Sequence, residues 1–446
     1  MSPKTAVVGA GLSGLSAARA LARSGQDVVL LEASPRPGGV VRTVACDGFL
    51  CETGPNTVRP APGLWRLIQE LGLAGEVLLA DARSPRYVDF EGALHPLPMS
   101  PMALLRSRLL TARGKWRLLS EPFRRASARP DESVRDFITR RLGPEAADRL
   151  VEPFVAGIFA GSAARLDAAA AFPSLVRWER EHGSLVRGAA AVRRANAPGP
   201  STPRGLVSFR TGLEALPRAM AAGLGPAFRP ACDVRAVEPG PGGGWTVHSA
   251  MGVVEADRVF LASPAHVAAG LVAGFAPEAS RALSAIPHPP LAVLHLAWPD
   301  TALARPLEGF GHLVCPDANR RILGAVWSSS LFAGRAPAGQ ALLTVFLGGA
   351  RDPDALALSD SGLAAAAARD LEAEGLVRGA PRVVLVTRWE RAIPQYERGH
   401  AERIAALAAA EARWPGLHFL GNYRGGVSVA DVIRSGLEAA GSAAVA

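Results

Sequence analysis

The residues best suited to chemistry are three glycines near the N-terminus, set between an apolar run and a helical stretch. The run Thr5 to Val8 indicates a buried strand, and it leads at once into Gly9-Ala10-Gly11-Leu12-Ser13-Gly14. In this spacing the first glycine permits a tight turn, the second lets the backbone approach a pyrophosphate, and the third lets helix and strand pack closely. The helix N-terminus adds free N–H groups and a partial positive charge. The pattern predicts a loop that binds the phosphates of a dinucleotide.

An acid completes this unit. The helix ends at Gly25, and the apolar run Val28 to Leu31 indicates a second strand that leads directly to Glu32. A carboxylate at this place binds ribose hydroxyls and disfavours a 2′-phosphate. A glycine-rich turn of some other α/β protein is the alternative. The order of strand, helix, strand and terminal acid favours a nucleotide-binding βαβ unit.

Three further turns favour FAD over a nicotinamide cofactor. Gly38 and Gly39 follow Glu32 closely, as in proteins where an extended FAD runs past the second strand. The turn from Glu52 to Thr57 can bring backbone N–H groups to a flat ring, although an ordinary Gly-Pro turn is the simpler explanation of that stretch alone. A strand, a glycine turn at 421–426 and a helix from about Ser428 would return the chain to the first domain. That helix N-terminus can stabilise negative charge on a reduced flavin.

Composition narrows the class of protein. With 446 residues, of which 49% are apolar, the chain can form two or three domains with large cores. No apolar run is long enough to span a bilayer, and we expect no signal peptide because a strand begins at once. The four cysteines form no CxxC pair, which indicates reduced thiols, and the nine histidines lack metal-ligand spacing, so we expect no metal.

The net charge of +9 is compatible with a nucleic-acid or an anionic membrane partner. Its distribution favours the membrane, because basic residues gather between positions 106 and 129, among leucines, Trp116 and Phe123, and only Glu121 opposes them. These basic residues are Arg106, Arg108, Arg113, Lys115, Arg117, Arg124, Arg125 and Arg129. A solvated helical face that covers a core is an alternative of equal weight. We expect a cytoplasmic protein, bound peripherally to the inner face of the cell membrane, and no nucleic-acid partner.

The remaining pattern predicts a mixed α/β fold with three domains. Strands are expected at 234–237, 245–247, 259–262, 291–298 and 341–347, and an alanine-rich helix at 363–371. We assign 1–84, 201–265 and 396–446 to a Rossmann-like FAD-binding domain, 85–200 to a substrate and helical membrane-binding region, and 266–395 to a substrate domain with a mixed sheet. The Pro/Gly/Ser-rich stretch 196–203 marks a boundary.

Over nearly its whole length the chain resembles the oxygen-dependent protoporphyrinogen oxidases. The shared motifs are GAGLSG at 9–14, PGG at 37–39, ETGPNTVRP at 52–60, SPRYV at 84–88, PFVAGIFAG at 153–161, FPSLVRWEREHGSLVRG at 172–188, LEGFGHLVCP at 307–316, SSSLFAGRAP at 328–337, PQY at 394–396 and GNYRGGVSVADVIRSG at 421–436. The first motif is common to many flavoproteins, whereas the middle and last motifs are much narrower. The resemblance implies an amine-oxidase-like fold with FAD, substrate and helical membrane-binding domains.

The resemblance also implies which residues bind. The residues placed on FAD, which we expect to be non-covalent because the turns at 38–39 and 421–422 contain no cysteine or histidine, are Gly9, Ala10, Gly11, Leu12, Ser13, Gly14, Glu32, Ala33, Val40, Gly54, Pro55, Asn56, Thr57, Val234, Trp389, Gly421, Val427, Ser428 and Val429. On the substrate side Arg86 would pair with a propionate, and Gly157 would offer its carbonyl to the ring. Leu313 and Phe332 would sandwich the macrocycle. A surface position for Arg86 and plain core packing for Leu313 and Phe332 are the alternatives.

The implied reaction is oxidation of a porphyrinogen, in haem and porphyrin biosynthesis. Hydride would pass from a methylene bridge to flavin N5, and a pyrrole nitrogen would release a proton. Molecular oxygen would accept the electrons and give hydrogen peroxide. No catalytic side chain is required beyond those that position the ring and keep the site dry. Because Arg86 is the one cation placed in the pocket, we expect protoporphyrinogen IX to be preferred over coproporphyrinogen III, which carries two more propionates.

Several alternatives stay open. A coproporphyrinogen III oxidase is the nearest, and a carotenoid desaturase is a second FAD-dependent possibility. An amine oxidase is disfavoured because Val40 replaces the usual Arg after the paired glycines and Asn422 replaces the usual Glu. A non-catalytic protein similar to the GDP-dissociation inhibitors would lack flavin and its yellow colour. The oligomeric state is open between a monomer and a homodimer.

Overall fold

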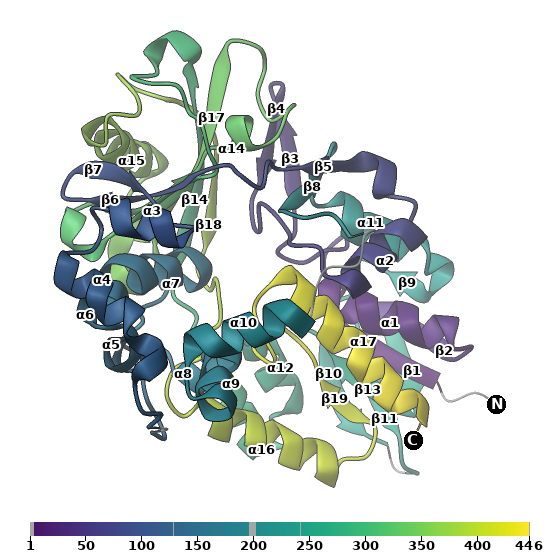
Figure 1. The fold of residues 1–446 in the computed structure, drawn as a ribbon. Coiled ribbons are helices and arrows are strands. Elements are labelled where there is room, and N and C mark those ends of the chain that lie inside the picture. Colours follow the sequence, from purple (N-terminus) through teal and green to yellow (C-terminus); the bar gives the residue numbers. More distant parts are fainter. Residues whose placement is uncertain (1–3, 128, 196–201, 241, 446) are drawn as a thin grey trace.

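The computed structural model describes residues 4–127, 129–195, 202–240 and 242–445. A parallel sheet occupies one side of the molecule, a mixed sheet the other, and a group of helices packs beside the mixed sheet (Figure 1). The predicted mixed α/β class is confirmed. Most of the expected boundary at 196–203 lies outside the described residues.

The parallel sheet is assembled from three distant parts of the sequence. Its strand order is β19-β13-β1-β2-β9, and every neighbouring pair is parallel. The strands are β1 (Lys4–Val8), β2 (Asp27–Leu31), β9 (Phe228–Arg229), β13 (Arg258–Leu261) and β19 (Leu417–Phe419). Most residues of the four longer strands are buried, as expected of parallel strands covered on both faces, whereas neither residue of the edge strand β9 is.

One face of this sheet is covered by helices and the other by a small antiparallel sheet with further helices. On the first face, α17 packs so closely on α1 that a Cβ at Gly436 would lie 2.4 Å from the Ser13 carbonyl oxygen. The elements of the first face are α1 (Leu12–Arg23), α2 (Pro62–Glu70), α11 (Ala215–Ala222) and α17 (Val429–Val445). Those of the second are β10 (Val234–Pro239), β11 (Trp245–Ser249), β12 (Gly252–Ala256), α12 (Ala265–Val272), α13 (Pro277–Ser284) and α16 (His400–Arg413).

The mixed sheet has seven strands in the order β18-β14-β17-β16-β15-β6-β7. Its strands are β6 (Arg86–Phe90), β7 (Ala93–Pro96), β14 (Leu291–Pro299), β15 (Gly311–Val314), β16 (Ile322–Val326), β17 (Gln340–Gly348) and β18 (Arg382–Trp389). Helix α15 (Asp360–Ala373) covers one face. Strand β6 pairs parallel with β15, so residues 86–96 join this sheet rather than the helices that follow them.

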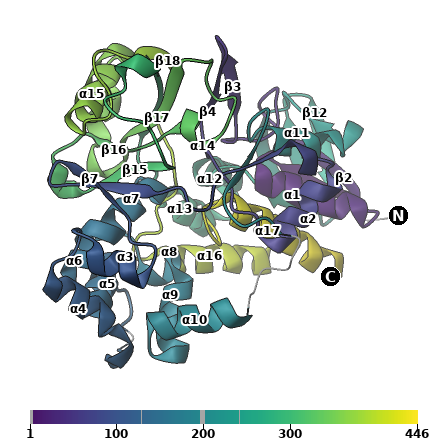
Figure 2. The same ribbon diagram turned by 45° about the horizontal axis from the view of Figure 1, so that its top comes forward.

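The helical region lies below the mixed sheet, as the turned view shows best (Figure 2). Its helices are α3 (Pro101–Arg106), α4 (Ala112–Leu119), α5 (Val134–Leu142), α6 (Pro144–Ala146), α7 (Glu152–Phe159), α8 (Ala168–Ala171), α9 (Pro173–His182) and α10 (Leu185–Ala195). Ser133 caps the N-terminus of helix α5, and Gly143 follows its last residue.

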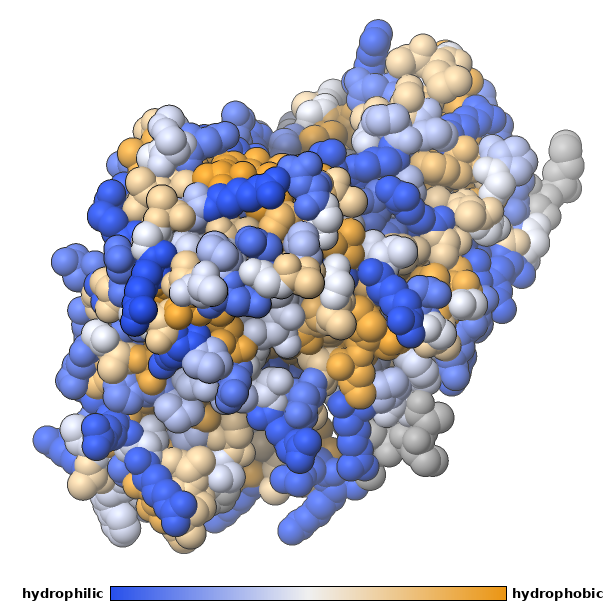
Figure 3. Space-filling view, turned by 90° about the horizontal axis from the view of Figure 1, so that it is seen from above, coloured by the Kyte–Doolittle hydropathy of each residue, from blue (hydrophilic) through white to orange (hydrophobic). Residues whose placement is uncertain are grey.

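A hairpin, an antiparallel pair of strands distant in sequence, and one short helix lie between these bodies. They are β3 (Thr43–Cys46) with β4 (Phe49–Glu52), β5 (Val77–Leu79) with β8 (Val207–Phe209), and α14 (Ser328–Leu331). Seen from above, hydrophobic side chains form separate patches with hydrophilic ones between them (Figure 3). This face therefore carries no single continuous apolar surface.

Candidate active site

The first glycine turn has the shape that a pyrophosphate needs. Gly9 adopts a φ of +103°, and a Cβ at Gly14 would lie 2.0 Å from the Gly9 carbonyl oxygen, so neither position accepts a side chain. A Cβ at Gly11, in contrast, would meet no atom within 4 Å. Helix α1 begins immediately afterwards, and no side chain caps its N-terminus. The open space at Gly11 and the uncapped N–H groups fit the phosphates of a dinucleotide.

Glu32 and the second glycine turn lie against the first. The Glu32 carboxylate accepts hydrogen bonds from the Ala10 N–H at 2.6 Å and the Ser34 N–H at 2.9 Å. The Gly38 N–H donates to the Ala10 carbonyl at 2.7 Å, and a Cβ at Gly39 would lie 3.4 Å from the Gly11 Cα. The structure thus brings the two glycine turns and the acid into one cradle.

The outer edge of this cradle continues from Glu32 into β10. The Cys232 N–H donates to the Glu32 carbonyl at 2.7 Å, which places Val234, at the start of β10, next to the acid. Ala33 follows Glu32 directly, and Val40 is 46% exposed beside the second glycine turn. These positions lie beside the acid and the second glycine turn, and their contact with FAD stays a prediction.

The turn at 52–57 is held between this cradle and the mixed sheet. A Cβ at Gly54 would lie 2.1 Å from the Val40 carbonyl oxygen. The Trp389 indole N–H donates to the Thr53 carbonyl at 2.9 Å, and His295 Nε2 lies 3.1 Å from the Glu52 carbonyl oxygen. Burial lowers the pKa of His295 to about 4, so its imidazole is neutral. The Trp389 side chain therefore holds the backbone of this turn in place from the side of the mixed sheet.

The C-terminal turn also reaches the first domain, as predicted. Strand β19 leads into Gly421, whose φ is +151°, and α17 follows the turn and packs on α1. Ser428 caps α17, because its Oγ accepts from the Asp431 N–H at 3.2 Å. Val427 to Val429 thus stand at a helix N-terminus, where a partial positive charge faces outward.

On the substrate side, Gly157 and Leu313 meet. Gly157 lies on α7 and is exposed, and a Cβ there would be 2.5 Å from the Leu313 Cδ2 atom. Arg86 starts β6, opposite Gly311 of β15, so the alternation of both strands places Arg86 and Leu313 on the same sheet face. The Arg86 guanidinium lies over the Phe310 ring, 5.2 Å from its centroid.

Phe332 stands apart from that group. It follows α14, is 4% exposed, and packs with Ala80 and Leu331. It lines a small cavity of about 10 Å³, enough for about one water molecule. The other lining residues are Leu50, Glu52, Asn56, Val326, Ser328, Leu331 and Arg335. The cavity joins the turn predicted for FAD, through Asn56, to the wall predicted for substrate.

Sequence reasoning missed the two charges in this cavity. Glu52 and Arg335 are both buried, and their charged groups lie 4.0 Å apart. Burial raises the pKa of Glu52 to about 7, although hydrogen bonds from the Leu213 N–H and the Thr43 hydroxyl act in the opposite direction. Both residues lie inside motifs quoted above, ETGPNTVRP and SSSLFAGRAP. Their place in these motifs was the signal that could have identified them as site residues.

Arg59 is a third residue that the sequence analysis did not place in the site. Burial lowers the pKa of Arg86, and the positive charge of Arg59 lowers it further. Among the residues that the structure describes, no carboxylate acts on the pKa of Arg86, and neither Arg59 nor Arg86 forms an ion pair. The substrate side therefore holds two unpaired cations where the sequence placed one.

The fold and the cradle together define an FAD-dependent oxidoreductase. The family model of flavin containing amine oxidoreductases matches residues 12–443, and the chain belongs to this family.

The chain is also similar to individual named proteins. The chain is 33% identical to the chloroplastic protoporphyrinogen oxidase of Oryza sativa subsp. japonica, over 97% of this chain and 87% of the relative. It is 34% identical to the protoporphyrinogen oxidase of Bos taurus, over 97% of both chains. It is 28% identical to the coproporphyrinogen III oxidase of Bacillus subtilis (strain 168), over 98% of this chain and 97% of the relative.

Solved structures show the same fold. A structure from Exiguobacterium sp. 255-15, described provisionally as a protoporphyrinogen oxidase, superposes with a TM-score of 0.82 at 24% identity, covering 100% of this chain and 99% of the other. Putrescine oxidase bound to putrescine gives a TM-score of 0.69 at 19% identity, covering 100% of both chains.

Proposed function

We propose that this protein oxidises protoporphyrinogen IX to protoporphyrin IX, with O₂ as acceptor and hydrogen peroxide as product. The observation that carries this is the contact of the bare Gly157 backbone with Leu313, on the sheet face that also holds Arg86. A flat apolar wall with a cation at its edge suits a large ring that bears carboxylates. The names of the rice and bovine relatives support the same substrate.

The residues of the chain have distinct tasks in this proposal. Bound FAD supplies a two-electron acceptor. The Arg86 guanidinium binds a propionate and fixes the orientation of the ring, and the Gly157 carbonyl accepts a hydrogen bond from a pyrrole N–H. Leu313 and Phe332 exclude water, which protects the reacting bridge carbon. Positioning of this kind can supply much of the rate acceleration without a catalytic side chain.

A specific observation favours coproporphyrinogen III as a second candidate. Arg59 lies close enough to lower the pKa of Arg86, and Arg335 lines the cavity beside Phe332. Additional cations reduce the cost of burying additional propionates. The relative from Bacillus subtilis carries the name of this activity.

Comparing kcat/KM for the two porphyrinogens decides between the candidates. If protoporphyrinogen IX is the substrate, it has the higher value, and Arg86→Ala raises KM more than it lowers kcat. Arg59→Ala then has little effect. A wild-type preference for coproporphyrinogen III that disappears in Arg59→Ala would overturn the first assignment. An Arg86→Ala enzyme with unchanged kinetics would remove Arg86 from the site.

We also propose peripheral binding to an anionic membrane through the helical region. Large apolar side chains stand exposed there, with Trp116 at 73% and Phe123 at 85%. Between residues 99 and 123 the other exposed apolar side chains are Met99, Met102, Leu105 and Leu119, and the exposed arginines near them are Arg106, Arg108, Arg113, Arg125 and Arg129. In the part of the chain that the structure describes, no helix is long and apolar enough to cross a bilayer.

Two of the eight basic residues in this segment have a structural role instead. Arg117 donates to the Arg140 carbonyl at 3.0 Å, and Lys115 donates to the Leu105 carbonyl at 2.8 Å. A test of membrane binding should therefore leave them unchanged. The suitable triple variant is Arg106→Gln, Arg108→Gln and Arg113→Gln, and the matched control is Arg66→Gln, Arg281→Gln and Arg378→Gln.

Sedimentation with anionic vesicles separates the two variants. Each basic residue near such a surface contributes about 1 kcal/mol, and this falls as salt rises. The first variant should bind weakly at a salt concentration where the control still binds. Equal sedimentation of the two would show that this surface does not bind the membrane.

A further inference from the structure

The motif Pro394-Gln395-Tyr396 takes no part in the reaction proposed above, yet it lies where two parts of the fold are connected. It connects β18 of the mixed sheet to α16 beside the parallel sheet. Gln395 and Tyr396 are each only 2% exposed. A buried polar pair in a connection between two sheets calls for partners on both sides.

The phenol of Tyr396 bonds to both ends of the C-terminal turn. Its hydroxyl donates to the Asn422 carbonyl at 2.6 Å and accepts from the Gly426 N–H at 3.0 Å. These two residues bracket the turn that leads into the N-terminus of α17. One side-chain oxygen therefore closes this turn from the inside.

The rest of the motif contacts the helix that carries Gly157. The Tyr396 ring meets the Phe159 ring edge-on, with centroids 6.0 Å apart, and its other neighbour is His400, stacked at 4.2 Å. The Gln395 amide donates to the Phe159 carbonyl at 2.7 Å. Val427, just after the turn, packs against the apolar cluster that includes Phe159.

We infer that Tyr396 is a positioning residue, which sets the N-terminus of α17 against the flavin and ties it to the substrate helix α7. This rests on the flavin site proposed above. The partial positive charge of a helix N-terminus acts only within about one turn, so a displacement of the 422–426 turn weakens it at the flavin. The reduced flavin carries the negative charge and loses most by this displacement.

Tyr396→Phe tests the inference, because it removes one oxygen and keeps the ring. The matched control is Tyr423→Phe, since the Tyr423 ring is also fully buried but its hydroxyl has no hydrogen-bond partner among the described residues. Loss of two hydrogen bonds should raise the Kd for FAD about tenfold in Tyr396→Phe. The flavin midpoint potential should shift to more negative values. Tyr423→Phe should leave both quantities as in the wild type.

The readouts are FAD titration of the apoprotein and a spectroscopic redox titration, and neither needs a porphyrinogen. Failure of the proposed substrate therefore leaves this inference standing, and the reverse also holds. Wild-type Kd and potential in Tyr396→Phe would overturn it, as would a shift of the same size in Tyr423→Phe. If Tyr396→Phe does not fold, Phe159→Leu keeps the hydroxyl and should give a smaller shift in the same direction. No shift in that variant would also count against the inference.

Discussion

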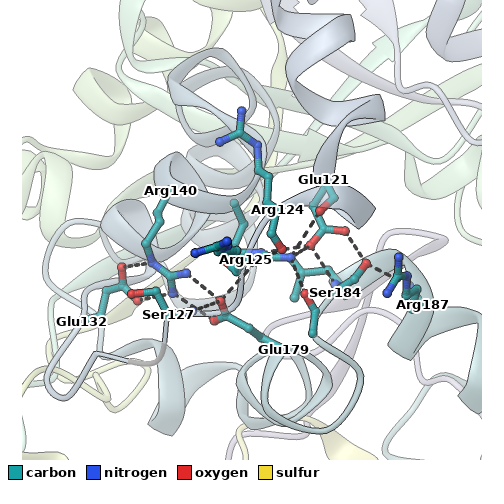
Figure 4. Close-up of polar contacts among 12 residues, drawn as sticks. Glu121, Arg124, Arg125, Ser127, Glu132, Arg140, Glu179, Ser184 and Arg187 are labelled. Carbon is teal, nitrogen blue, oxygen red and sulfur yellow. Dashed lines mark hydrogen bonds and ion pairs between the residues drawn. The ribbon is translucent and has the colours of Figure 1, made fainter.

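The parallel sheet and the helical region are held together by different forces. In the sheet, β1 and β2 bury Ala6, Val7, Leu30 and Leu31 almost completely, and apolar contact dominates. In the helical region the buried residues include Glu121, Arg141 and Glu179, each no more than 2% exposed. Figure 4 shows Glu121 and Glu179 within a network of charged and polar side chains that come from segments distant in sequence.

Glu121 is the centre of the charged network. Its carboxylate accepts from the Ser184 hydroxyl at 2.6 Å and from the Leu185 N–H at 2.9 Å, so it caps α10 from a remote turn. It also pairs with Arg141, while Arg140 bridges Glu132 and Glu179 (Figure 4). The packing of the sheet is thus determined by a local apolar pattern. The packing of the helical region also depends on ion pairs between residues distant in sequence.

The largest expected effect comes from breaking a pair in this network. Arg141→Ala leaves Glu121 buried without its cation, and loss of one partner of a buried pair costs about 3–5 kcal/mol. The control is Arg382→Ala, whose pair with Asp47 is more than half exposed, and which should cost about 0–1 kcal/mol. Urea unfolding measures both. Equal costs would mean that the network contributes no more than a surface pair.

The second prediction concerns pH, because Glu121 of the helical region and Glu52 of β4 contribute to stability with opposite pH dependence. Burial alone would raise the pKa of Glu121, but hydrogen bonds from Ser184, Leu185 and Arg141 outweigh it and lower the pKa. Stability from Glu121 is therefore present at neutral pH and is lost as pH falls through its folded pKa. Burial raises the pKa of Glu52 from 4.5 to about 7, so its contribution is present below pH 4.5 and is lost as pH rises toward 7.

Glu52→Gln removes the titratable group and so isolates the contribution of Glu52 to the pH dependence of stability. Between the two pKa values the wild type should lose on the order of 3 kcal/mol relative to the variant as pH rises. Unfolding free energies measured at several pH values in both proteins give this difference directly. A difference that is constant with pH would show that Arg335 keeps Glu52 ionised throughout.

The last prediction concerns the glycine cradle, where a substitution should change the stability of the fold least but prevent the binding of FAD. Gly11→Trp meets no atom near its Cβ, so the apoprotein should unfold at the wild-type temperature but retain no FAD. Gly14→Ala places its Cβ against the Gly9 carbonyl and should cost about 1–3 kcal/mol as well as flavin. Differential scanning fluorimetry and the visible flavin spectrum measure the two effects. An FAD-loaded Gly11→Trp protein would contradict the assigned pyrophosphate path.

These cases show why some of the molecule was predictable from sequence. The first βαβ unit, the glycine turns and the return of α17 follow from patterns within about thirty residues, and the structure has them. The cap from Glu121 to α10 joins positions more than sixty apart, and a lone acid in a basic run gives no sign of burial. The cavity charges Glu52 and Arg335 were missed for the same reason, as was strand β6, which pairs with residues 311–314 of β15. Of the candidate site, the cradle was predictable, and the second substrate-side cation was not.

The contact of Ser13 with Gly436 also bears on how the protein is made. Strand β19 and helix α17 follow residue 416, so the parallel sheet stays incomplete while the preceding residues leave the ribosome. At about 5–20 residues per second, synthesis of those residues takes roughly 20–80 s. During this time the apolar side of α1 and one edge of β13 lack their final cover. A nascent chain therefore exposes this apolar surface until its C-terminal segment has been made.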